Sequence, residues 1–95
     1  MKELRYERGA LDDLDEIFWR IATDNPQAAR RLIDRIKEVA KLIAALPLMG
    51  QKVRKSRFRW FRVEKYLIVY EVTEDEVIIH YVRHGARLRP WEKKK

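Results

Sequence analysis

The sequence predicts a two-layer α+β domain, in which an N-terminal strand and an antiparallel helical hairpin pack on a mainly antiparallel sheet of three to four strands. Apolar residues recur at helical spacing through residues 10–45. Three runs of aromatic and β-branched residues follow, over residues 57–63, 66–72 and 77–83, and the breaks between them are too short to hold a helix. Because 95 residues with 46% apolar content can build one core, residues 1–95 are predicted to form a single domain.

The first elements are a short strand and an amphipathic helix. Residues 2–6 alternate polar and apolar side chains, which predicts a strand that joins the sheet. From Ala10 to about Thr23 the spacing becomes helical. The apolar stripe is Leu11, Leu14, Ile17, Phe18 and Ile21, and the acids Asp12, Asp13, Asp15 and Glu16 fall elsewhere on the wheel, in the first turns, where the helix dipole favours negative charge. Trp19 lies at the flank of the stripe or beyond, where it either contacts a neighbouring element or anchors a partner.

A second helix begins at Asp24-Asn25-Pro26, because Asn is a strong N-cap and Pro suits the first helical position. Its apolar stripe predicts a helix of about 20 residues, or roughly 30 Å, that ends before Leu46-Pro47. The connection to the first helix is short, so the two helices fold back on each other as an antiparallel hairpin.

The three strands come next. The run from Tyr66 to Val72 is apolar on both faces until Glu71, so it is predicted to be central and paired on both sides. The apolar floor on which the helices pack is predicted to include Phe61, Val63, Ile68, Tyr70 and Ile79. Residues 88–95 are predicted to form a basic tail that frays.

The positive charge is unevenly distributed. Residues 1–50 contain 9 Lys and Arg and 9 Asp and Glu, whereas residues 51–95 contain 13 Lys and Arg and 6 Asp and Glu. This asymmetry favours a polyanionic or acidic partner for the C-terminal half, and the alternative is a basic surface that only aids solubility. Residues 50–56 are basic without an acid, and cations continue into the next run, interleaved with Phe58, Trp60 and Phe61. The segment is either a solvated loop and a core strand, or a surface that stacks bases and binds phosphate.

Most catalytic and cofactor chemistry is disfavoured. The chain has no cysteine, two histidines (His80 and His84) and three glycines, so neither a metal site nor a phosphate-binding glycine loop is expected, and no cofactor is predicted. Ser56 is the only serine and has no nucleophile elbow around it. Metal-free RNA cleavage remains open, because it needs only a general acid or base and cations that stabilise the charged phosphate. The available side chains are Arg59, Arg62, Lys65, Tyr81, Arg83, His84 and Arg87.

The N-terminus is charged within its first six residues, and no apolar run approaches the roughly 20 residues that span a bilayer. We therefore expect a soluble, cytoplasmic protein.

The order of these elements resembles the RelE/ParE toxin superfamily, and its ParE branch in particular. The resemblance covers the chain from about Leu4 to Arg87. It depends on the order and spacing of several motifs: Asp24-Asn25-Pro26, Leu46-Pro47-Leu48-Met49-Gly50, the Arg-rich strand, Lys65-Tyr66-Leu67-Ile68-Val69-Tyr70 and His84-Gly85-Ala86-Arg87. Two features depart from the pattern: Arg62 and Glu64 stand where small residues or proline are expected, and the lysine-rich tail is longer than usual.

The resemblance implies a toxin of a type II toxin–antitoxin system, neutralised by a ParD-like antitoxin and associated with plasmid stabilization. In ParE members the target is DNA gyrase, and in RelE members it is ribosome-bound mRNA, which a basic site on the sheet cuts. The long second helix and the His-Gly-Ala-Arg ending match the ParE pattern, which implies gyrase inhibition with no catalytic residues. The residues expected to bind partners are Arg57, Arg59, Trp60, Arg62, Lys65, Trp19 and Arg87.

Two alternatives remain. One is a RelE-like endoribonuclease that would use Arg62, Arg83, His84 and Arg87, with Arg83 stabilising phosphate charge and His84 moving a proton. The other is a non-toxic basic protein that only binds a partner or nucleic acid.

Overall fold

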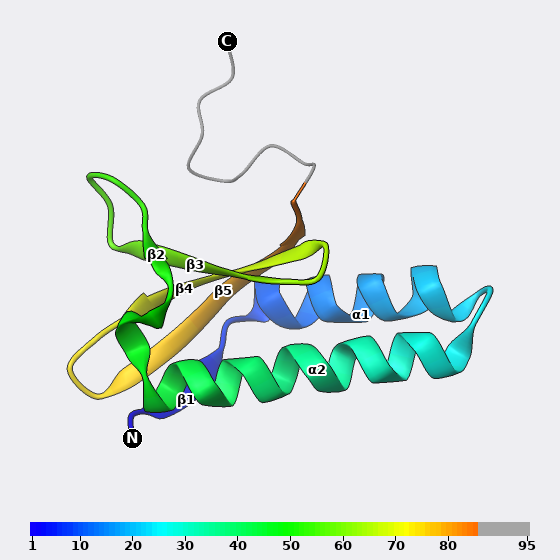
Figure 1. Cartoon of the computed structure of the whole chain (residues 1–95), viewed down its shortest axis with the longest axis horizontal. Helices are drawn as coiled ribbons and strands as arrows, with labels where there is room; N and C mark the ends of the chain where they lie inside the picture. Colours follow the sequence, from blue (N-terminus) through cyan, green and yellow to red (C-terminus); the bar gives the residue numbers. More distant parts are fainter. Residues whose placement is uncertain (86–95) are drawn as a thin grey trace, which may run out of the picture.

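The computed structural model describes residues 1–85, so the predicted tail and Arg87 lie outside the described residues. Two helices cover one face of a five-stranded sheet with the strand order β1-β5-β4-β3-β2, which confirms the two-layer α+β fold (Figure 1). The elements are β1 (Glu3–Tyr6), α1 (Arg8–Ala22), α2 (Pro26–Ala45), the 3-10 helix η1 (Pro47–Met49), β2 (Gln51–Lys52), β3 (Phe58–Val63), β4 (Tyr66–Val72) and β5 (Glu76–His84). No helix within residues 1–85 is long and apolar enough to cross a membrane.

The helical hairpin forms as predicted. The side chain of Asn25 accepts a hydrogen bond of 3.1 Å from the backbone N–H of Ala28, and Pro26 opens a helix of 20 residues. The helix α1 starts at Arg8, two residues earlier than Ala10, so its first turn contains no acid. The expectation that acids crowd the first turns is therefore wrong, and any favourable contact with the helix dipole is weaker at their positions.

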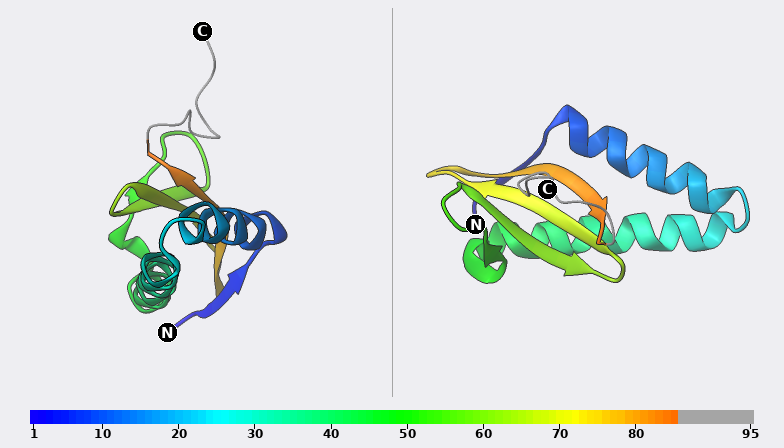
Figure 2. Two further views of the ribbon diagram at one scale, coloured as in Figure 1. Left: turned by 90° about the vertical axis from the view of Figure 1, so that its right-hand side faces the viewer. Right: turned by 90° about the horizontal axis from the view of Figure 1, so that it is seen from above.

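The sheet places β4 at its centre, between β3 and β5, as the sequence predicts. Residues Val63, Ile68, Tyr70 and Ile79 belong to the core beneath the helices, and Phe61 packs partly buried against it. The views in Figure 2 show both helices on the same side of the twisted sheet. The predicted floor of the core is therefore confirmed.

Two features of the sheet were not predicted. The strand β1 pairs in parallel with the first half of β5, from Glu76 to Ile79, which makes the sheet mixed. A two-residue strand, β2, pairs with Arg59 and Trp60 of β3 inside the segment interpreted as a loop or basic surface. The sheet consequently has five strands where three to four were expected.

A bulge at His80 changes the register of β5. Val69 pairs with Tyr81 and the next residue, Tyr70, pairs with Ile79, so His80 is an extra residue of β5 that has no partner in β4 at this point of the register. The bulge keeps Ile79 and Val82 on the core side although three positions separate them, which strict alternation would forbid.

The hydroxyl of Tyr70 fastens the exit of α2 to the sheet. It donates a hydrogen bond of 2.8 Å to the carbonyl of Pro47 and accepts one of 2.8 Å from the N–H of Gly50. Burial raises the pKa of this phenol, so it stays neutral and can make both bonds. A Cβ at Gly50 would collide with this hydroxyl and lie 2.9 Å from the carbonyl oxygen of Trp60. Only glycine fits here, for steric reasons.

Candidate partner-binding and phosphate-binding surfaces

Two arginines predicted as functional lie in one row across the sheet. Arg62 of β3 pairs with Leu67 of β4, which pairs with Arg83 of β5. Since strands lie about 4.8 Å apart, the two arginine Cα atoms are roughly 10 Å apart. Leu67 is 1% exposed and does not belong to the helix-side core, so the row starts on the face away from the helices, and Arg83 then reaches Asp13 of α1 at the edge of the sheet. An anion placed between the two side chains would be attracted by both, although each guanidinium group also has a partner within the protein.

Arg83 is held in place by its neighbours. Its Nε lies 3.4 Å from Oδ2 of Asp13, and its guanidinium carbon lies 5.1 Å from the ring centre of Tyr81. The same carboxylate oxygen accepts a hydrogen bond of 3.0 Å from the N–H of Val82. Arg83 Nε is buried and makes no hydrogen bond within residues 1–85, so the pair with Asp13 rests on charge attraction. Asp13 was expected on the polar face of its helix, and the structure instead packs it against β5.

His84 lies on the other face of the sheet. It pairs with Tyr66, a core residue beneath the helices, and the two rings meet edge to face with centres 5.3 Å apart. The next residue, Gly85, donates a backbone hydrogen bond of 2.7 Å to Lys65. The structure therefore places Arg62 and Arg83 in one cross-strand row and the ring of His84 on Tyr66, outside that row. The guanidinium group of Arg62 nevertheless lies close to Gly85, the residue after His84. Arg87, the fourth residue of the predicted ribonuclease set, lies outside the described residues.

The arginines of β3 and its entrance have intramolecular partners. Arg57 Nε lies 3.2 Å from Glu71, Arg59 donates a hydrogen bond of 2.9 Å to the carbonyl of Gly50, and Arg62 donates one of 3.2 Å to the carbonyl of Glu64. These three cations therefore have structural contacts within the protein, in addition to any contact with a partner. Of the other residues predicted to bind partners, Lys65 is exposed in the β3–β4 turn and Trp60 is half-buried.

A polar cluster that sequence reasoning missed lies on the helix-free face. Glu71 Oε1 lies 2.9 Å from Nε2 of His80, and the ring of His80 meets Phe58 edge to face at 5.2 Å. Burial alone would raise the pKa of Glu71, but hydrogen bonds from His80 and Arg57 outweigh it, and the pKa is lowered. The one signal available was that Glu71 is the single acid in an otherwise apolar central strand.

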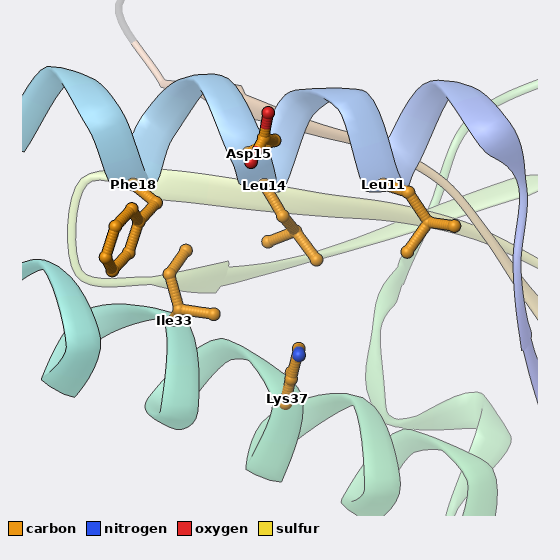
Figure 3. A pocket seen from close by; sticks show the side chains of 6 residues that line it. All are labelled: Leu11, Leu14, Asp15, Phe18, Ile33 and Lys37. Carbon is orange, nitrogen blue, oxygen red and sulfur yellow. The ribbon is translucent and has the colours of Figure 1, made fainter.

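A shallow apolar groove runs between α1 and α2. It has a volume of about 240 Å³ and is bordered by one acid and one base, Asp15 and Lys37. Figure 3 shows its side chains: Leu11, Leu14 and Phe18 descend from α1, and Ile33 rises toward them from α2. Leu11 is 46% exposed although it belongs to the predicted apolar stripe, so this part of the stripe is left uncovered by the fold.

Trp19 lies close to this groove along α1. Its side chain is 63% exposed, and its ring meets the ring of Phe18 edge to face at 5.2 Å. The contact is therefore with a residue of its own helix. The remaining surface of the indole is available to a partner.

Within residues 1–85 no three His, Cys, Asp or Glu side chains lie close enough together to hold a metal ion. The surfaces described above are an arginine row, the arginines of β3 and its entrance, and an apolar groove, which suit anions and amphipathic segments.

The model of the family "ParE toxin of type II toxin-antitoxin system, parDE" matches residues 4–89. The chain belongs to this ParE toxin family. It is thus a toxin of a type II toxin–antitoxin system, within the RelE/ParE superfamily that the sequence motifs resemble.

Known relatives carry both names of the superfamily. The chain is 35% identical over 79 residues to the toxin RelE2 of Caulobacter vibrioides, covering 83% of this chain and 90% of the relative. Its fold is similar to that in the structure of the chromosomal ParDE system from P. aeruginosa, with a TM-score of 0.77, 22% identity and coverage of 88% of this chain and 96% of that one. The RelBE2 toxin–antitoxin complex of Mycobacterium tuberculosis contains a similar fold, with a TM-score of 0.68, 21% identity and coverage of 87% and 96%.

Proposed function

We propose that this ParE-family toxin inhibits DNA gyrase, and so blocks replication, through protein–protein contact and without chemistry of its own. The observation that carries the proposal is the separation of the candidate catalytic groups. Arg62 and Arg83 lie in one cross-strand row, with Arg83 paired to Asp13 of α1, whereas the ring of His84 packs against Tyr66 in the core beneath the helices. A general acid or base must reach the reacting group within hydrogen-bond distance, and the ring of His84 packs against Tyr66 and does not belong to the arginine row. The match to the ParE family model supports the same target.

The test is a supercoiling assay with purified toxin, gyrase, ATP and relaxed plasmid. We expect loss of supercoiled product with rising toxin concentration and no shortening of a labelled mRNA on ribosomes. In cells that express the toxin alone, we expect filamentation and DNA-damage signalling before protein synthesis falls. Full supercoiling at a toxin concentration that stops growth would overturn the proposal. Absence of any growth defect under confirmed soluble expression would show that the protein is not an active toxin.

The second candidate is ribosome-dependent RNA cleavage, and the arginine row favours it. Arg62 and Arg83 lie in one cross-strand row, where their charges would attract a phosphate, and the phenol ring of Tyr81 lies beside Arg83. This mechanism predicts that Arg62→Gln with Arg83→Gln abolishes cutting while circular dichroism shows an intact fold. A matched pair, Arg31→Gln with Arg35→Gln on the exposed face of α2, should cut normally.

The antitoxin is proposed to be ParD-like and to occupy the groove between α1 and α2. An amphipathic segment would bury its apolar side against Leu11 and Phe18, next to the opposite charges of Asp15 and Lys37. Acidic residues of the same partner would reach the basic strand at Arg59 and Arg62. Gyrase, ribosomes and such an antitoxin all act in the cytoplasm, which is where we propose the toxin resides.

A further inference from the structure

The turn between β2 and β3 concentrates positive charge. Residues 51–62 contain six cations and no acid: Lys52, Arg54, Lys55, Arg57, Arg59 and Arg62. The last three have the partners described above. The first three are exposed and make no ion pair within residues 1–85. Three solvated cations are therefore presented by a single turn.

This turn is ordered by its own hydrogen bonds. The hydroxyl of Ser56 donates to the carbonyl of Val53 at 3.1 Å and accepts from the N–H of Phe58 at 3.0 Å, and the N–H of Val53 donates to the carbonyl of Phe58 at 2.9 Å. Lys55 has a φ of 58°, a left-handed conformation that costs a non-glycine residue about 1 kcal/mol. These hydrogen bonds hold the backbone of the turn in one conformation, so less backbone entropy is lost when the cations bind a ligand.

An aromatic side chain shares the same surface. A hollow of about 380 Å³ is lined by the turn from Gln51 to Ser56 and by Trp60. Apart from Trp60 and the buried Val53, its lining residues are polar or basic, so it lacks the apolar anchors that an amphipathic peptide needs. Cations that follow a backbone, together with a ring on which a base can stack, suit a nucleic acid.

We propose that the β2–β3 hairpin is a nucleic-acid site, in which Lys52, Arg54 and Lys55 bind the phosphate backbone and Trp60 contacts a base or sugar. Figure 1 shows this loop projecting from the sheet, away from the helical hairpin. The hairpin therefore lies apart from the α1–α2 groove, although the acidic residues of the antitoxin, proposed above to reach Arg59, would approach it. If the toxin acts on gyrase, the nucleic acid at hand is the DNA that gyrase holds, and this role rests on the proposed function. The binding itself does not.

The first experiment measures binding of labelled 20-base-pair DNA by fluorescence anisotropy between 50 and 200 mM NaCl. The test variant is Lys52→Gln/Arg54→Gln/Lys55→Gln. The control is Arg31→Gln/Arg35→Gln/Lys41→Gln, which removes the same charge from exposed positions of α2. We expect the hairpin variant to bind at least about 10-fold more weakly. The slope of log binding constant against log salt concentration should become less steep by about 3, since each lost phosphate contact reduces the slope by about 1. The control should stay within about 2-fold.

Equal losses in the two variants would show that net charge alone drives binding and would overturn the site, as would no binding by the wild type at 50 mM salt. A second variant, Trp60→Phe, keeps a stacking ring and should retain most of the affinity for single-stranded DNA. Trp60→Ala should lose about 5-fold or more. The same loss in both, with melting temperatures unchanged, would overturn the role of the ring.

Parallel supercoiling assays separate this inference from the gyrase proposal. A wild type that binds DNA through the hairpin but leaves gyrase active would refute gyrase inhibition and support the site. A toxin that poisons gyrase but shows no hairpin-dependent DNA binding would support gyrase inhibition and refute the nucleic-acid site.

Discussion

The carboxylate of Asp13 on α1 accepts a hydrogen bond of 3.0 Å from the backbone N–H of Val82. The strand β1 pairs only with Glu76 to Ile79, so the second half of β5 is an open edge beside the helix. Asp13 satisfies a backbone donor there and also faces Arg83 at 3.4 Å. One acidic side chain thus ties a helix to a strand edge that could otherwise pair with another chain.

We predict that Asp13→Ala lowers the free energy of unfolding by about 1–3 kcal/mol, because a backbone donor and an arginine lose their partner. Urea titration measures this. Asp12→Ala is the control: its side chain is 70% exposed in a pair of 3.6 Å with Arg8, and it should change stability by no more than about 0.5 kcal/mol. Equal losses in the two variants would contradict the role of Asp13.

Tyr70→Phe should cost about 1–2 kcal/mol, since the hydroxyl bonds both Pro47 and Gly50. Tyr66→Phe serves as the control in the same urea titration, because no hydrogen bond is seen for the Tyr66 hydroxyl within residues 1–85. A similar cost in both variants would mean that the phenol ring of Tyr70, and not its two hydrogen bonds, fastens the exit of α2.

Gly50→Ala should be more harmful than Tyr70→Phe, because the new methyl group meets the Tyr70 hydroxyl and the carbonyl of Trp60. Removing the hydroxyl relieves one of these two clashes. The double variant Gly50→Ala/Tyr70→Phe should therefore lose less stability than the sum of the single changes, by about 0.5 kcal/mol or more. Strict additivity in a thermal or urea double-mutant cycle would argue against the clash.

Glu71 should make stability depend on acid pH. Its pKa is lowered in the folded protein, from a usual value of 4.5, because hydrogen bonds from His80 and Arg57 outweigh burial. A carboxyl with a lowered folded pKa stabilises the fold above its unfolded pKa, and this contribution is lost as the pH falls through the folded pKa. Glu71→Gln should therefore destabilise the protein at pH 6 and differ less from the wild type near pH 3. Parallel profiles of unfolding free energy against pH would contradict this.

Antitoxin binding should depend on the α1–α2 groove. Leu11→Asp places a charge in the groove, and it should speed dissociation of the antitoxin at least about 10-fold in surface plasmon resonance, since most interface changes act on dissociation. Leu42→Asp alters an equally exposed leucine, 52% against 46%, that does not line this groove. A matching effect of both substitutions would place the antitoxin elsewhere.

Charge reversal at Arg59 and Arg62 should slow association of an acidic antitoxin. The effect should be larger at 50 mM than at 300 mM salt, because salt screens the long-range attraction that speeds the encounter. Arg59 also holds the carbonyl of Gly50, so melting temperatures are measured beside the kinetics. Arg31→Glu with Arg35→Glu is the control for net charge. Unchanged association rates at both salt concentrations would show that β3 does not guide the encounter.

The sequence patterns predicted both helices and the central strand because apolar spacing and the Asn25-Pro26 cap are local signals. The two-residue β2 and the bulge at His80 depend on pairing between strands, which no short stretch encodes. The partners of the arginines follow from that pairing: Glu71 reaches Arg57 and His80 only once β3, β4 and β5 are in register. A helical wheel could not reveal Asp13 as a contact of β5, because the wheel shows which side of a helix is polar and not what lies beside it.

The parallel pairing of β1 with β5 has a consequence for synthesis. Leu4 meets Val77, so the first strand finds its place only after more than 70 further residues have been added. Contacts between distant parts of a chain close a large loop and slow folding. A ribosome making this toxin therefore carries an unfinished sheet until β5 emerges. We therefore expect the surfaces built on the complete sheet to form only at the end of synthesis.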